Sequence, residues 1–315
     1  MVNNDIDPIF NRLRKKRTYL ISVFLMGLAF MVFVVVGLMV SLSVSACRNH
    51  DRHSKDLPYK NETYSESVNE ESEGVSGSRS HYVMSDSVVW FCMPSPMEGL
   101  SEQIIRKCSY VVSYNKETMM PNWVAWQLTG EHTDGPYGRL SNFYEEEEVP
   151  SPRATLEDYR GSGWSRGHMC PAGDNKWDER AMYDSFSLVN VCPQNANLNS
   201  GLWNSIEISC RKWAKMYGSL YIVCGPIFFK SQEHERIGTN QIPVPEAFFK
   251  VILCIDSSAP KGIGFICRNT DGNKKKDFYV NSIRQVERVT GYQFFPNLSD
   301  SIRSIVYDMD DINIW

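Results

Sequence analysis

The stretch from Gly163 to Asp174, GWSRGHMCPAGD, combines glycines with an arginine and one of only six histidines in this chain. His168 follows Arg166 and Gly167 directly. Glycine allows unusual backbone angles and close approach by neighbours. An arginine two residues from a histidine puts a fixed positive charge beside a titratable base. The interior of a helix or a strand has no need for this composition, so the pattern predicts a functional loop at 163–174.

Further polar side chains follow His168 in the same region of the chain, namely Asn190, Gln194, Asn199 and Glu207. Amide and carboxylate oxygens are hard donors that suit Mg²⁺, which keeps several waters and takes few protein ligands. A neutral histidine can take a proton from water, and an arginine can bind phosphate through two hydrogen bonds. These groups together favour metal-assisted hydrolysis of a phosphodiester.

Two segments carry a family resemblance, SRGHMCPAGDNKW (165–177) and LVNVCPQNANLNSGLWNSIE (188–207). Both resemble the DNA/RNA non-specific endonuclease family, which includes secreted bacterial nucleases and mitochondrial endonuclease G. Further segments look like that family in the same order along the chain: SYNKETMMPNWVAWQLT (113–129), YIVCGPIF (221–228), VPEAFFKVIL (244–253) and VTGYQFFPNL (289–298). The resemblance covers roughly residues 105–300, and a long ordered match is more specific than a short signature.

The resemblance implies the ββα-metal, or His-Me finger, fold, in which a strand pair and a helix surround one divalent ion. The hydrophobic pattern independently predicts an α+β domain with a central, mainly antiparallel sheet. It favours strands at 110–129, 219–229, 247–256 and 261–269, and helices at 201–217 and 281–290. The segment 143–163 is expected to be loop with one short helix, and its glutamates 145–148 a solvated face.

The resemblance also assigns roles to individual residues. It implies that His168 is the general base and that Asn199 binds the metal ion directly. It implies that Glu207 holds water around the metal, that Asn190 supports the site, and that Arg166 lies near the phosphate.

The signature departs from the common Asp-Arg-Gly-His form at one position, because Ser165 stands where much of the family has aspartate. Serine can still form hydrogen bonds but adds no negative charge, so any orienting role of that aspartate would be weaker. The expected phosphate contacts are basic side chains around the motif: Arg166, Lys176, Arg180, Arg211, Lys212 and the NKKKD run at 273–277.

The predicted function is therefore that of a membrane-tethered endonuclease that hydrolyses DNA and RNA with little sequence specificity. Its cofactor is expected to be Mg²⁺, with Mn²⁺ as a substitute. Two alternatives stay open at this point. One is an inactive nuclease-like module that binds nucleic acid, and the other is a cysteine hydrolase that uses Cys170 as its nucleophile.

The N-terminus predicts a membrane attachment. A basic cluster precedes the apolar run, made of Arg12, Arg14, Lys15, Lys16 and Arg17. No charged residue occurs between Leu20 and Ala46, a run longer than the ~20 residues that span a bilayer. Basic residues before such a run stay in the cytoplasm, which sends the rest outside. The run fits an uncleaved anchor or a lipoprotein signal, since Val44-Ser45-Ala46-Cys47 resembles a lipobox.

These patterns divide the chain into a basic cytoplasmic segment (1–18), a transmembrane or signal segment (19–46), a disordered polar linker (47–85) and the nuclease domain (86–315). The domain is expected to be periplasmic or on the cell surface. A net charge of −4 argues against a protein that coats DNA electrostatically but leaves a local basic cleft open. Nine cysteines leave disulfide pairing open, and a homodimer is not excluded.

Overall fold

The computed structural model describes residues 84–229, 233–257 and 259–315. These residues belong to one compact unit, Val75–Trp315. Across the described ranges, no helix has the length and apolar character that crossing a bilayer requires. The predicted segments 1–18 and 19–46, and nearly all of the predicted linker, lie outside the described residues, so those assignments stay predictions.

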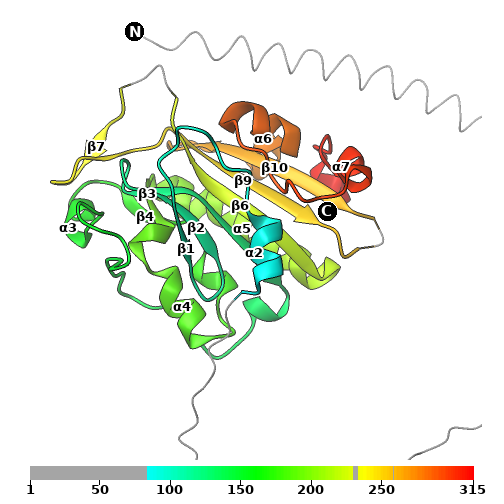
Figure 1. The fold of residues 1–315 in the computed structure, drawn as a ribbon, viewed down its shortest axis with the longest axis horizontal. Helices are drawn as coiled ribbons and strands as arrows, with labels where there is room; N and C mark the ends of the chain where they lie inside the picture. The colour runs from blue at the N-terminus through cyan, green and yellow to red at the C-terminus, as the bar shows by residue number, and fades with distance from the viewer. Residues whose placement is uncertain (1–83, 230–232, 258) are drawn as a thin grey trace, which may run out of the picture. The chain divides into compact units, whose positions relative to one another are not determined.

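A seven-stranded sheet forms the centre of the unit, and each strand runs antiparallel to its neighbours (Figure 1). In spatial order the strands are β1 (Gln103–Arg106), β2 (Val111–Asn115), β3 (Met120–Thr129), β6 (Ser219–Ile227), β9 (Ala247–Cys254), β10 (Lys261–Arg268) and β11 (Val280–Asn281). Two small ribbons stand apart from this sheet, β4 (Ser165–His168) with β5 (Val191–Gln194), and β7 (Arg236–Ile237) with β8 (Ile242–Pro243). The predicted antiparallel α+β architecture is confirmed.

Both faces of the central sheet are covered, which explains why β9 is buried along its whole length. Phe248 and Ile252 belong to the hydrophobic layer on one face, and Phe249 and Val251 to the layer on the other. The sequence of a strand that is covered on both sides is a continuous apolar run, without alternation of apolar and polar residues. The run AFFKVILC shows this pattern, with one lysine in it.

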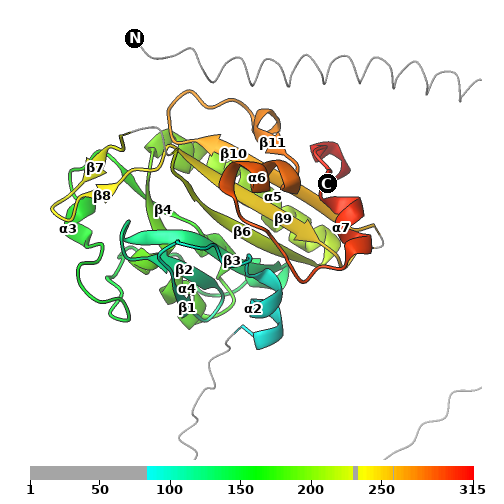
Figure 2. The ribbon, with the colours of Figure 1, turned by 45° about the horizontal axis from the view of Figure 1, so that its top comes forward.

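Helices form a layer on each side of the sheet (Figure 2). On one side pack α2 (Asp86–Cys92), α6 (Ile283–Thr290) and α7 (Asp300–Val306), and on the other pack the long helix α5 (Asn204–Tyr217) and the β4–β5 ribbon. Two short helices, α3 (Leu156–Tyr159) and α4 (Glu179–Ser185), lie in the chain around the ribbon. Helix α6 begins at a capping box of Ser282 and Gln285 and ends at Gly291 with a φ of 81°.

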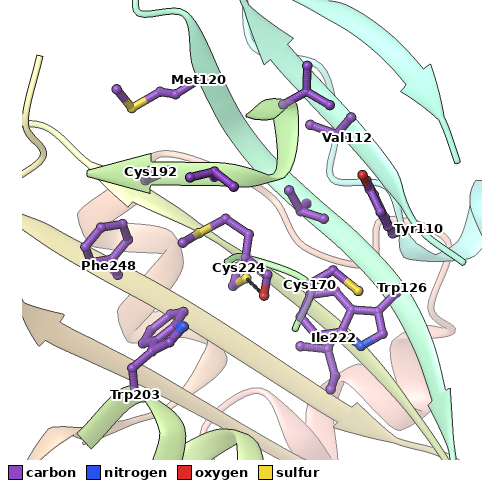
Figure 3. Packing of buried hydrophobic residues seen from close by; sticks show 14 of the residues in the cluster. Tyr110, Val112, Met120, Trp126, Cys170, Cys192, Trp203, Ile222, Cys224 and Phe248 are labelled. Atoms are coloured by element: carbon purple, nitrogen blue, oxygen red, sulfur yellow. Dashed lines mark hydrogen bonds between the residues drawn. The ribbon is translucent and has the colours of Figure 1, made fainter. Parts of the chain in front are cut away.

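The layer between the sheet and α5 is rich in aromatic and sulfur side chains (Figure 3). The ring of Trp203 lies 5.7 Å from that of Phe248, and the Cys224 thiol donates to the carbonyl of Met169 at 3.3 Å. The cysteines at 92, 170, 192, 210, 224, 254 and 267 are buried free thiols. These cysteines therefore act as small core residues in the structure.

Two local predictions are wrong. The stretch predicted as a loop contains strand β4, because Gly167 lets the side chain of Gln194 on β5 lie against its Cα. A Cβ at this position would be 2.3 Å from Gln194 Oε1. The glutamate run is not wholly a solvated face either. Glu146 is buried, accepts a hydrogen bond from Ser187 at 2.7 Å and pairs with Lys107 at 2.8 Å.

Candidate active site

The β4–β5 ribbon brings the two halves of the sequence motif together. Ser165 lies opposite Gln194, and His168, the last residue of β4, lies opposite Val191. The pairing continues one step further, because the Met169 amide donates to the carbonyl of Asn190 at 2.9 Å. His168 and Asn190 therefore meet at the same end of the ribbon.

Asn190 is fully buried, and its side chain is occupied by the backbone around it. Its Nδ2 donates to the carbonyls of Cys170 and Ser185, each at 2.8 Å, and its Oδ1 accepts from the Cys170 amide at 2.8 Å. These bonds fix the chain that leaves His168. The geometry fits the supporting role that the resemblance implied and leaves little room for a metal ion at Asn190.

His168 is buried between two aromatic rings. Its imidazole lies 4.9 Å from the ring of Phe143 and 5.0 Å, edge to face, from that of Phe186. Its Nε2 atom is buried and has no hydrogen-bond partner within the described part of the chain. Burial, followed by the charges of Arg139 and Arg166, lowers the pKa of His168 to about 3. The imidazole is therefore neutral near pH 7 and can accept a proton.

Two exposed arginines cap these aromatic rings. The guanidinium of Arg166 lies 4.6 Å from the centre of the Phe143 ring, and that of Arg139 lies 5.4 Å from the centre of the Phe186 ring. An anion bound to them would offset the smaller part of the His168 pKa shift, the part that comes from their charge. Arg139 was not predicted, because nothing in its local sequence distinguishes it from an ordinary loop arginine.

A hydrogen bond from Trp203 connects the helical segment that begins at Leu198 to strand β4, which ends at His168. A π-helical segment, Leu198–Trp203, leads directly into α5, and the Trp203 Nε1 donates to the carbonyl of His168 at 3.3 Å. Asn199 lies on this segment and is partly exposed, with no side-chain hydrogen bond to any described residue. Its amide oxygen is therefore available to a ligand.

Glu207 lies in the first turn of α5, about two helical turns beyond Asn199 on the same helical run. Burial raises the pKa of Glu207 to about 7, a shift that the opposite charge of Lys250 moderates. The charge of Arg139 makes a smaller contribution that lowers the pKa of both Glu207 and His168. The structure thus joins the start of α5 to the end of β4 through the bond from Trp203 to the His168 carbonyl, and the shared metal site stays a prediction.

Two of the expected phosphate contacts are engaged in ion pairs. Arg211 donates to Asp174 at 2.9 Å, and Gly173 permits this approach because a Cβ there would lie 2.8 Å from the Arg211 Nη1. Arg180 pairs with Asp184 at 2.8 Å. Three other expected contacts, Arg166, Lys176 and Lys212, are exposed and form no ion pair among the described residues.

The donor set of the site fits a hard divalent cation. Asn199 offers an amide oxygen for direct ligation, and the Glu207 carboxylate on the same helical run would hold water around the ion. Among the described residues, no group of three or more His, Cys, Asp or Glu side chains is arranged to hold a metal ion. A site with one protein oxygen and water suits Mg²⁺, whereas Zn²⁺ is usually held by three or four protein ligands.

The thiol of Cys170 is a poor candidate for a nucleophile. The side chain has no exposed surface, and burial raises its pKa well above the ordinary value. Because the thiolate is the reactive form, a buried thiol of this kind is inert. The cysteine hydrolase alternative therefore loses support.

Comparisons with known proteins identify the family of the chain. The family model described as DNA/RNA non-specific endonuclease matches residues 93–301. The mitochondrial nuclease EXOG of Mus musculus is 35% identical over 67% of this chain, but the match spans only 61% of the mouse protein. The mitochondrial endonuclease G of Bos taurus is 34% identical over 62% of this chain and 70% of its own.

A solved structure shows the same fold. It is a crystal structure of an EndoG/EndoGI complex, described as showing the mechanism of EndoG inhibition. The matched chain superposes with a TM-score of 0.64 at 24% sequence identity, covering 71% of this chain and 95% of its own.

Proposed function

Because the chain belongs to the DNA/RNA non-specific endonuclease family, we propose that it is a metal-dependent endonuclease that hydrolyses DNA and RNA with little sequence preference. The main support for this proposal is the protonation state and the surroundings of His168. Its imidazole is neutral and buried, its Nε2 lacks a hydrogen-bond partner among the described residues, and two exposed arginines flank it.

In the proposed mechanism, His168 takes a proton from the water that attacks phosphorus in line with the leaving 3′ oxygen. Arg166 and Arg139 hold the phosphate against the aromatic rings beneath them. Glu207 accepts hydrogen bonds from water in the site and orients it. A Mg²⁺ ion held by Asn199 would supply positive charge for the phosphate and the leaving oxygen.

This chemistry explains why little sequence preference is expected. The groups proposed to contact substrate are arginines, lysines and a metal ion, all of which recognise phosphate. Phosphate contacts position a nucleic acid but carry no sequence information. Selectivity between DNA and RNA would need a group that reads the 2′-hydroxyl.

The direct test is cleavage by the purified unit 75–315. The folded unit is expected to nick supercoiled plasmid and to degrade single-stranded RNA in Mg²⁺ or Mn²⁺. If it binds plasmid but leaves both substrates intact, the result favours an inactive binding module over an active nuclease. If it neither binds nor cleaves nucleic acid, both readings fail.

We further propose that the unit is anchored to a membrane and faces away from the cytoplasm. The support is the basic cluster at 12–17 and the uncharged run that follows it. A tether of this kind would keep a non-specific nuclease separate from the cell's own nucleic acids.

This topology makes a prediction for whole cells. Protease added to intact cells or spheroplasts should remove the nuclease unit, because positive charge before the apolar run keeps only the N-terminus inside. The measurement is an immunoblot for the C-terminus, with a cytoplasmic protein as the control for lysis. Full protection of the unit in spheroplasts, with degradation after lysis, would refute this orientation.

A further inference from the structure

A buried asparagine connects the central sheet to the segment that leads into the π-helix. Asn269 directly follows β10 and is only 4% exposed. Its main-chain amide donates to the carbonyl of Glu246 at 2.8 Å, which continues the pairing of β10 with β9 one step beyond Arg268 and Ala247. The backbone of Asn269 is therefore fixed by the sheet.

The side chain of Asn269 contacts the chain where it leaves the β4–β5 ribbon. Its Oδ1 accepts a hydrogen bond from the main-chain amide of Asn195 at 2.8 Å. Its Nδ2 donates to the carbonyl of Pro193 at 3.1 Å and to that of Pro245 at 2.8 Å. One carboxamide thus holds the backbone on both sides of Gln194.

Asn195 connects Asn269 to the residue that is proposed to bind the metal ion. Its carbonyl accepts a hydrogen bond from the main-chain amide of Asn199 at 2.9 Å. Its side-chain Oδ1 accepts from the amides of Asn197 at 2.9 Å and Leu198 at 3.2 Å. The start of the helical run is therefore built on Asn195, so the position of Asn199 depends on where Asn195 is held.

Another hydrogen bond joins the same two segments, but it lies at the surface. Asn197 Nδ2 donates to Asp271 Oδ1 at 2.9 Å, and both residues are exposed. Water can replace either partner of an exposed bond, whereas a buried polar group that loses its partner bears the cost of desolvation. Of these two side-chain connections, the buried one through Asn269 therefore determines where Asn195 lies.

We propose that Asn269 is a positioning residue of the nuclease site, which holds Asn195 and thereby places Asn199 for metal binding. The inference rests on the proposed function, in which Asn199 is the one direct protein ligand. Mg²⁺ demands nearly ideal geometry, so a ligand is effective only when the residues behind it hold it in place. The bond from the Asn195 amide to Asn269 provides this support from the sheet.

The test compares Asn269→Ala with Asn269→Asp in the full chain. Alanine removes all three side-chain hydrogen bonds, whereas aspartate keeps an acceptor for the Asn195 amide and loses both donors. The matched control is Asn122→Ala, because Asn122 is also buried and its side chain also makes three hydrogen bonds. The partners of Asn122 are Ser101, Ser113 and Asn115, none of them a residue of the candidate site.

Three quantities are measured for the wild type and each variant. They are Mn²⁺ affinity without nucleic acid, from the loss of the free-ion EPR signal, hydrogen exchange of the amides of 195–203 in EDTA, and urea unfolding in EDTA. Plasmid nicking in Mg²⁺ is recorded alongside them.

Asn269→Ala is expected to weaken Mn²⁺ binding about tenfold, at the lower end of the loss for residues that act behind a metal ligand. Hydrogen exchange in 195–203 should be about tenfold faster than in Asn122→Ala, because an amide of this segment has lost its acceptor. Asn122→Ala should be less stable in urea but keep the wild-type Mn²⁺ affinity. Asn269→Asp should keep both the affinity and the slow exchange, and the added charge of aspartate does not mimic the second effect.

The proposal is overturned if Asn269→Ala keeps the wild-type Mn²⁺ affinity, or if exchange in 195–203 rises no more than in Asn122→Ala. If Asn269→Ala does not fold, Asn269→Asp decides. Affinity and exchange close to wild type support the bond to Asn195, and a loss of affinity as large as that expected for alanine contradicts it.

Two further outcomes have a clear meaning. If neither Asn269 variant folds while Asn122→Ala does, Asn269 serves the fold alone and the proposal fails. A wild-type chain that binds Mn²⁺ but does not nick plasmid refutes the proposed function, and the Mn²⁺ affinity and hydrogen exchange of the variants still decide the role of Asn269.

Discussion

Replacement of His168 by alanine should reduce the rate of plasmid nicking by about 10²–10⁴-fold, the usual contribution of a general base. The imidazole is the neutral, buried group of the site, and its Nε2 has no other partner among the described residues. Binding should persist, because the arginines and lysines proposed to contact phosphate are unchanged. The measurement is single-turnover nicking, with plasmid affinity determined by filter binding.

The control for this substitution is another histidine with a polar contact. His234 pairs with Glu246 at 2.6 Å and lies against the ring of Phe228, outside the proposed machinery. His234→Gln should therefore nick plasmid at close to the wild-type rate. If the His168→Ala variant is folded and retains a rate within a few fold of wild type, another group must activate the water.

Replacement of Asn199 by alanine should raise the Mg²⁺ concentration needed for half-maximal nicking by at least ~10–100-fold, the loss usually seen even for residues that act only behind a metal ligand. Asn199 is proposed as the one direct protein ligand, and its amide is not engaged by other described residues. Added Mg²⁺ should recover part of the activity, while affinity for plasmid measured in EDTA stays unchanged.

Asn190→Ala is the informative contrast. Its amide makes three buried hydrogen bonds to the backbone around Cys170, so the main loss should be stability, about 2–4 kcal/mol in urea unfolding. The Mg²⁺ concentration at which the folded Asn190→Ala protein reaches half-maximal nicking should rise much less than in Asn199→Ala. If Asn190→Ala shifts the metal midpoint and Asn199→Ala does not, the ligand assignment is inverted.

The sequence predicted those features that depend on neighbouring residues. The apolar run 247–256 predicted a buried strand, which the structure confirms as β9, Ala247–Cys254. The histidine after Arg-Gly predicted a functional site, and the structure places it at the end of β4. The end of α6 at Gly291 was also visible, because glycine takes up the left-handed angle that closes a helix.

The features that the sequence did not predict depend on residues far apart in the chain. The sequence predicts a loop at Gly167, because the close contact of this residue with Gln194 arises only when β4 pairs with β5. The sequence predicts a solvated Glu146, because its partner Lys107 comes from a distant part of the chain. Arg139 joins the site only because its loop lies over Phe186.

One experiment on metal dependence distinguishes the proposed metal-dependent nuclease from the inactive binding module and from the cysteine hydrolase. The purified unit 75–315 is incubated with supercoiled plasmid in EDTA, and an excess of Mg²⁺ is then added to the same sample. The account predicts no nicking in EDTA and rapid nicking once Mg²⁺ is present, with both rates unaffected by a thiol-blocking reagent. Nicking that proceeds in EDTA, or that the thiol reagent abolishes while the protein stays folded, would contradict a metal-dependent nuclease built on His168 and Asn199.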